Sequence, residues 1–184
     1  MASIAEIKQW FNKFASTGGD RASLVTSGNI GGLTNIVSSN VVMSVAGAAA
    51  TGDYVGTSVT PQYFSDAVLK PGGTGLIKSI TIADKLTTTA VALELWLFSA
   101  TFVAPTDNAA WAISDTESFT CLGVIPIATD KWYASSNNKV YSDDTLALGI
   151  KLPNTNLYYA LVARGTTPAW TSLDLNIALT ILQD

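Results

Sequence analysis

Histidine is absent from this chain of 184 residues, and cysteine occurs once, as Cys121. Without histidine the chain cannot form a Ser-His-Asp or Cys-His catalytic site, and it lacks the commonest protein ligand for metal ions. A single cysteine cannot form a disulfide within the chain, and without histidine it cannot complete a typical zinc site. We therefore expect no metal, no cofactor, and a buried, unreactive thiol at Cys121, which lies in an apolar segment.

Charge is scarce as well. Charged residues make up 13% of the chain, its ten basic residues are scattered singly, and the formal net charge is -4. Proteins that bind nucleic acid need clustered Lys and Arg to neutralise the phosphates, so we expect no nucleic-acid partner.

Long apolar runs are also missing. The nearest, residues 41–50, is too short to cross a bilayer and is rich in Ala and Gly, so we expect no membrane partner. Residues 1–15 carry three charges where a signal peptide would have its apolar centre, so we expect folding in the cytoplasm of the cell that makes the chain.

Alternating apolar residues are the clearest pattern present. Within residues 88–98, Val91, Leu93, Leu95 and Leu97 share one face of an expected strand, while Glu94 and two large aromatic residues share the other. The first face belongs in a core. The mixed face indicates a strand that is covered in part or lies against a neighbouring subunit.

Further strands are expected at short intervals, separated by Pro, Gly and Asn, with no long helical pattern between them. This spacing is typical of an antiparallel sandwich or barrel, and we predict an all-β fold, a jelly-roll-like antiparallel β-sandwich over residues 61–184. Ser114 and Glu117 have the spacing of a capping box for one helical turn. The other strands are expected at residues 76–83, 121–127, 139–141, 145–152, 157–163 and 173–182.

Residues 1–60 are expected to form a separate part: a short N-terminal helix followed by an extended arm that leads into a first strand near residues 39–45. Ser3 and Glu6 fit a capping box, and Gly18 with Gly19 ends the helical pattern. The helix either packs on its own domain or docks on a partner through an apolar stripe. The candidate partner-binding residues are Ile4, Ile7, Trp10, Phe11 and Phe14.

Chemistry-bearing residues are few. Two carboxylates can suffice for a glycosidase, but the acids of the expected loops, Asp115 and Glu117 among them, show no pairing pattern, and we expect no enzyme activity. Four aromatic side chains could instead stack on sugars, although core packing and subunit contacts also enrich such residues. The candidate glycan-stacking residues are Trp111, Trp132, Tyr133 and Trp170.

Several segments, in their shared order, resemble a family of small virion proteins of tailed bacteriophages. The similarity covers about residues 69–184, and the N-terminal sixty residues depart from it. The segments that carry it are Leu95–Phe98, Pro105–Ala110, Ile113–Asp115, Cys121–Ile125, Leu157–Gly165 and the terminal Leu182–Asp184.

The resemblance implies a capsid decoration, or cement, protein located on the virion head surface. Its implied partners are the major capsid protein and further copies of itself in a homotrimer. Stiff, weakly charged, repeated subunits can bind durably through many individually weak contacts. The alternative is a virion-associated glycan-binding or adhesin module, such as a receptor-binding or head fibre protein.

Overall fold

The computed structural model describes residues 33–44, 47–57, 61–86 and 90–184, and a compact unit spans Thr34–Asp184. The predicted N-terminal helix, with Ile4, Ile7, Trp10, Phe11 and Phe14, lies outside the described residues. The strands are β1 (Leu33–Asn40), β2 (Tyr54–Val55), β3 (Gln62–Phe64), β4 (Thr74–Asp84), β5 (Leu93–Phe98), β6 (Cys121–Ile127), β7 (Trp132–Ala134), β8 (Lys139–Asp143), β9 (Leu148–Lys151), β10 (Leu157–Ala163) and β11 (Leu175–Gln183). Between them lie the one-turn helix α3 (Asp115–Ser118) and the 3-10 turn η1 (Thr129–Lys131).

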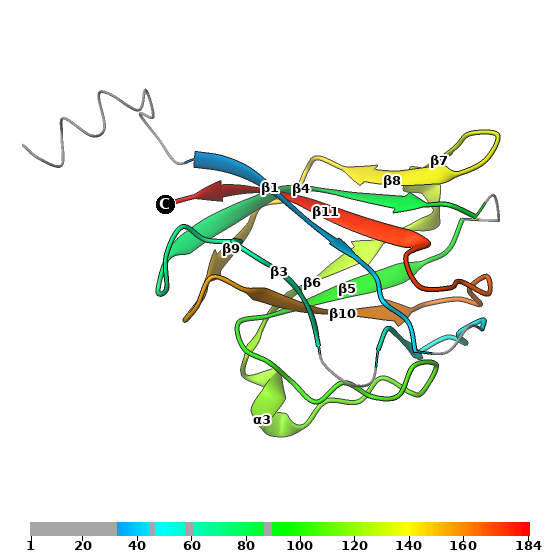
Figure 1. Cartoon of the computed structure of the whole chain (residues 1–184), viewed down its shortest axis with the longest axis horizontal. Coiled ribbons are helices and arrows are strands. Elements are labelled where there is room, and N and C mark those ends of the chain that lie inside the picture. Colours follow the sequence, from blue (N-terminus) through cyan, green and yellow to red (C-terminus); the bar gives the residue numbers. More distant parts are fainter. Residues whose placement is uncertain (1–32, 45–46, 58–60, 87–89) are drawn as a thin grey trace, which may run out of the picture. The chain divides into compact units, whose positions relative to one another are not determined.

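The described strands form two antiparallel sheets that pack as a sandwich. One sheet has the order β1-β11-β4-β8-β7, with β9 also paired to β4, and the other has the order β2-β10-β5-β6, with β3 also paired to β10. Figure 1 shows the two sheets as facing layers. The prediction of an all-β sandwich is therefore confirmed.

The two strands with the most regular alternation lie inside the sheets. β5 lies between β10 and β6, and Leu93, Leu95 and Leu97 are at most 1% exposed. β11 lies between β1 and β4, and its alternate residues from Leu175 to Ile181 are fully buried. Each such side chain contributes about 1.5–3 kcal/mol by leaving water. The predicted inward face of both strands is confirmed.

The second face of β5 is covered by the chain's own loop, residues 99–114. Phe98 is fully buried there, with its ring centroid 4.6 Å from that of Phe102. The Trp111 ring meets Trp96 edge-on at 5.8 Å. These residues belong to a second, smaller hydrophobic cluster on the outer side of the five-stranded sheet.

Backbone hydrogen bonds hold this loop against β2. Asn108 N donates to Tyr54 O, and Tyr54 N donates to Ala109 O, at 2.9 and 2.8 Å. Farther along, Trp111 N donates to Gly52 O at 2.8 Å. The loop is thus fixed at several points along the edge of the sheet, which keeps its aromatic residues over the buried Phe98.

Glu94 also lies on this outer face, between the aromatic residues of β5. Its Oε2 atom accepts hydrogen bonds from Arg164 Nη2 at 2.6 Å and from Trp96 Nε1 at 2.9 Å. The guanidinium of Arg164 holds the pKa of Glu94 below its usual value, and the Trp96 indole acts in the same direction. The carboxylate is therefore satisfied within the chain.

Several predicted strands match the structure closely. Those expected at residues 121–127 and 157–163 coincide with β6 and β10, and the strand expected at 76–83 lies within β4. β2, β3 and β7 were not predicted, since each has only two or three residues. Too little sequence is present in such elements to show an alternating pattern.

The first strand begins earlier than expected. We expected an arm leading to a strand near residues 39–45, whereas β1 runs from Leu33 to Asn40 at the edge of the six-stranded sheet. Val37 faces inward at 6% exposure, but the outward position beside it is also apolar, Ile36 at 69% exposure. The sequence of β1 therefore shows no clear apolar-polar alternation. Within residues 33–60, the described strands β1 and β2 belong to the sandwich. The N-terminal helix and the start of the arm lie in residues that the structure does not describe, so they stay predictions.

Candidate functional site

Two of the candidate glycan-stacking tryptophans, Trp132 and Trp170, flank a buried ion pair. Asp84 and Lys139 face each other across β4 and β8, are 1% and 2% exposed, and their Oδ2 and Nζ atoms are 3.3 Å apart. Trp170 Nε1 donates to Asp84 Oδ2 at 3.1 Å, and Lys139 Nζ lies 5.0 Å from the Trp132 ring centroid. Both indoles therefore surround and shield the ion pair.

The exposure of these two rings differs. Trp170 is 1% exposed and offers no ring face to a ligand in this structure. Trp132 is half-buried, because its Nε1 atom donates to Val91 O at 3.0 Å and its ring contacts Tyr141 edge-on at 5.6 Å.

Trp111 and Tyr133 lie elsewhere. Trp111 is half-buried on the outer face of the five-stranded sheet, where its ring stacks on Tyr54 with centroids 5.8 Å apart. Tyr133 lies on β7, in the other sheet, and is 67% exposed. The structure thus does not gather the four candidate rings on one surface, and only Tyr133 among them is mostly in solvent.

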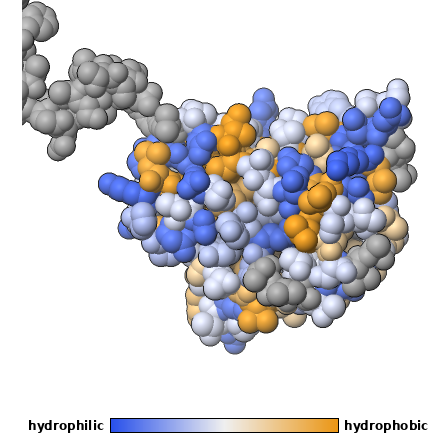
Figure 2. All heavy atoms as spheres, viewed as in Figure 1, coloured by the Kyte–Doolittle hydropathy of each residue, from blue (hydrophilic) through white to orange (hydrophobic). Residues whose placement is uncertain are grey.

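Two of the most exposed apolar side chains in the described part of the chain are held on adjoining segments. Phe119, which caps the C-terminus of α3, is 88% exposed, and Val103 in the neighbouring loop is 79% exposed. We call these two residues the apolar tip. On the face shown in Figure 2, hydrophobic surface occurs in separate patches, one of them at the end where α3 lies in Figure 1.

Glu117 braces the tip by joining α3 to the loop. Its Oε1 atom accepts a hydrogen bond from Val103 N at 2.6 Å. Its Oε2 atom accepts from Ser114 N at 2.8 Å and from Ser114 Oγ at 2.7 Å, while Ser114 Oγ accepts from Glu117 N at 3.2 Å. Ser99 N also donates to Thr120 O at 2.9 Å. The predicted capping box is therefore confirmed, and the same carboxylate positions Val103.

We expect Glu117 to titrate below 4.5, its ordinary pKa. The backbone N–H of Val103, followed by the N–H and hydroxyl of Ser114, favours the charged carboxylate and lowers its pKa. Because the pKa is lowered, the charged carboxylate braces the loop fully at pH values above the ordinary pKa. The brace is lost as the pH falls through the lowered pKa of the folded protein.

Carbon-detected NMR titration of the Glu117 carboxyl measures this directly. Glu117→Gln should make the Val103 amide exchange faster with solvent at pH 7. A titration midpoint at or above 4.5, or unchanged exchange in the variant, would show that the carboxylate does not brace the loop.

Two other acids, Asp143 at the end of β8 and Asp107 in loop 99–114, have structural partners. Asp143 pairs with Lys131 and accepts from Thr145 N and Oγ1, and these contacts lower its pKa to about 2, with the lysine contact the largest cause. Asp107 Oδ1 accepts from Gly56 N at 3.1 Å. Within the described ranges, no group of three or more His, Cys, Asp or Glu side chains could hold a metal ion. Nor does that part of the chain contain a helix of the length and apolarity needed to cross a membrane.

Sequence reasoning did not single out the apolar tip. The capping box was recognisable from its spacing, but an apolar residue after a short helix is usually packed inward. The helix α3 has a single turn and no buried residue, so no apolar stripe turns it toward the core. Phe119 follows this helix as its C-cap residue and stays in solvent.

A scan against models of known protein families finds no match, and a search of curated proteins finds none either.

Proposed function

We propose that this protein is a structural virion subunit of a tailed bacteriophage, a decoration protein that binds the surface of the head and stabilises it without catalysis. Its partners are the major capsid protein and further copies of itself, in a homotrimer. The proposal combines the resemblance carried by residues 69–184 with the surface of the folded domain. One observation carries it furthest: the braced apolar tip.

The brace makes the tip unusual. A solvent-facing Phe or Val gains nothing from exposure, and isolated exposed apolar residues usually lie on ordinary loops. Here one carboxylate accepts three hydrogen bonds and links the helix that precedes Phe119 to the loop that carries Val103. Holding apolar side chains in place before binding reduces the conformational entropy lost on association. A rigid apolar projection therefore supports contact with another protein.

The strand order supports a jelly roll, a fold with about eight strand positions in two sheets. We take β2 with β3, and β8 with β9, as single positions, and β7 as an addition at an edge. In chain order the eight positions are then β1, β2 with β3, β4, β5, β6, β8 with β9, β10 and β11. Across one sheet the positions run first, eighth, third and sixth. Across the other sheet they run second, seventh, fourth and fifth. This alternation of the chain between the two sheets supports our proposal of jelly-roll connectivity. Such a domain serves as a stiff unit from which binding surfaces project.

A second attachment point is proposed from the sequence alone. The stripe formed by Ile4, Ile7, Trp10, Phe11 and Phe14 would bind the capsid shell as an amphipathic helix binds a groove. Three-fold clustering would let several weak contacts act together, so that neither the tip nor the helix needs a large interface of its own.

Particles of the phage that encodes the chain test the proposal. Particles lacking the protein are mixed with purified variants, sedimented, and the bound protein is quantified. Val103→Ser combined with Phe119→Ser should reduce binding at limiting protein at least about tenfold, as expected when apolar anchors of an interface are lost. Deletion of residues 1–17 should also abolish binding while leaving the unit Thr34–Asp184 folded.

Leu69→Ser is the matched control, because Leu69 is 53% exposed but lies outside the tip, in the chain between β3 and β4. It should bind like the unaltered protein. Full occupancy by the tip variant would show that the tip is not part of the attachment site. Full occupancy by the deletion variant would show that the N-terminal helix is not part of it. Failure of the unaltered protein to bind at all would overturn the decoration role.

A further inference from the structure

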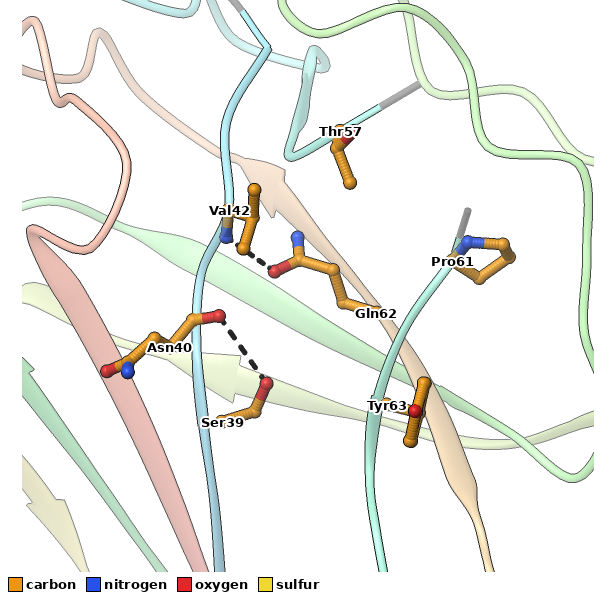
Figure 3. Close-up of a pocket in the computed structure, with 7 residues that line it drawn as sticks. All are labelled: Ser39, Asn40, Val42, Thr57, Pro61, Gln62 and Tyr63. Atoms are coloured by element: carbon orange, nitrogen blue, oxygen red, sulfur yellow. Dashed lines mark hydrogen bonds between the residues drawn. The ribbon is translucent and has the colours of Figure 1, made fainter. Parts of the chain in front are cut away.

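An open hollow of about 450 Å³ lies between the edge strands of the two sheets. One side is formed by the end of β1 and the residues that follow it, and the other by β3 and the chain next to it (Figure 3). Its volume is within the roughly 300–1,000 Å³ of small-molecule sites. Its lining residues are Ser39, Asn40, Val42, Thr57, Pro61, Gln62 and Tyr63.

This lining carries no charged side chain. It combines hydroxyl groups from Ser39 and Thr57, the amide of Gln62 and the aromatic ring of Tyr63, while the Asn40 amide points away and accepts from Asn176. Hydroxyls and amides can each donate and accept hydrogen bonds, so together they suit a ligand rich in neutral hydroxyl groups. An ionic ligand would find no countercharge among these residues.

Gln62 is the most informative of them, because it is only 7% exposed. In Figure 3 its side chain reaches from β3 toward Val42, with its amide nitrogen on the side of Thr57. The Oε1 atom accepts hydrogen bonds from Val42 N at 2.7 Å and from the Tyr159 hydroxyl at 3.1 Å. These two bonds fix the direction of the amide.

The Gln62 Nε2 atom, by contrast, has no hydrogen-bond partner within the described structure. The Tyr54 hydroxyl lies beside it: burial raises the pKa of Tyr54 to about 12, and the Gln62 amide, which can only donate through Nε2, opposes that rise. A Cβ atom on Gly56 would lie 2.7 Å from Nε2, so only glycine at this position leaves room for the amide where it lies. A buried donor without an acceptor is costly, and a ligand that supplies the acceptor recovers that cost.

Tyr63 adds an apolar surface beside these polar groups. It is 48% exposed, and its ring centroid lies 5.8 Å from that of Tyr158, which holds the ring from one direction. A partly exposed ring next to the Gln62 amide and the hydroxyl groups can cover the apolar C–H face of a sugar while the polar groups bond to its hydroxyls.

We propose that this hollow binds a neutral saccharide, with the Gln62 amide donating to a sugar oxygen and the Tyr63 ring covering one sugar face. This site differs from the four rings singled out from the sequence, and only Gln62, Tyr63 and their neighbours enter it. Saccharide binding here is also independent of capsid attachment through the apolar tip, so the experiment below and the particle experiment can fail separately.

The first test observes Gln62 in the unaltered full-length protein. Neutral oligosaccharides of glucose, galactose, mannose and N-acetylglucosamine are titrated into ¹⁵N-labelled protein, with oligogalacturonate as an acidic comparison. At least one neutral oligosaccharide should shift the Gln62 side-chain amide signals in a saturable manner, more strongly than oligogalacturonate does. If no neutral oligosaccharide moves these signals, or only oligogalacturonate does, the proposal is wrong.

The second test uses variants of Tyr63. Tyr63→Ala should weaken binding of the neutral oligosaccharide at least about tenfold, whereas Tyr63→Phe, which keeps the ring, should retain it. Tyr133→Ala is the matched control, because this tyrosine is 67% exposed on β7 in the other sheet. Unchanged binding by Tyr63→Ala, or loss of binding in Tyr133→Ala alone, would place the sugar elsewhere and overturn the proposal.

Discussion

Replacing Lys139 with methionine is expected to lower the free energy of unfolding by about 3–5 kcal/mol, the usual cost of breaking a buried ion pair by removing one partner. Asp84 would keep hydrogen bonds from Trp170 Nε1 and Leu86 N but would lose the ammonium 3.3 Å from its carboxylate. The carboxylate, 1% exposed, would then be buried without its countercharge. Urea unfolding followed by tryptophan fluorescence measures the loss.

Two further variants make this result specific. Lys131→Met removes a lysine that is 40% exposed and paired with Asp143, and a pair whose lysine is partly in solvent should cost no more than about 1 kcal/mol. Adding Asp84→Asn to Lys139→Met removes the uncompensated charge and leaves an acceptor oxygen for Trp170, so it should recover a large part of the stability. Equal losses for Lys131→Met and Lys139→Met would contradict the role assigned to the buried pair.

The second large effect is expected at Phe98. Phe98→Ala should destabilise the protein by about 3–5 kcal/mol, because a fully buried phenylalanine leaves a cavity between the outer face of β5 and loop 99–114. It should also loosen that loop, since Phe102 and Trp111 both pack against the Phe98 ring. Chemical unfolding gives the loss in stability, and limited proteolysis followed by mass spectrometry locates the loosened segment.

Phe119→Ala provides the matched control for this substitution. The same atoms are removed, but Phe119 is 88% exposed, so the change in stability should stay within about 0.5 kcal/mol. If both substitutions cost the same, or if cleavage in Phe98→Ala falls outside loop 99–114, the loop is not the cover of this sheet face. A stable Phe119→Ala protein is also the form in which the tip's role in attachment can be measured.

The fold was predictable where one strand carries a full alternating pattern. Leu93, Leu95 and Leu97 were expected on one inward face, and all three are buried. The partner of the opposite face was not predictable, since periodicity shows that a face is mixed but not what covers it. In the structure that cover is Phe102 and Trp111 from the following loop, which are brought over the sheet by hydrogen bonds to β2.

Site prediction from sequence was limited for a related reason. A tryptophan in a sheet protein has the same local pattern whether it faces solvent or a buried charge. Trp170 is buried because Asp84, 86 positions away in the chain, accepts its indole hydrogen bond, and no local pattern reports such a pairing. Gln62 was not singled out either, because its partners Val42 and Tyr159 meet it only in the folded sandwich.

Cryo-electron microscopy of the purified phage particle is the most direct test of the central claim that this domain acts by lying against other virion proteins. We predict density for the sandwich on the outer surface of the head, in three-fold clusters, with the α3 end and its Phe119 against the shell. A particle that lacks the chain, together with a free monomer that turns over a substrate, would contradict the account.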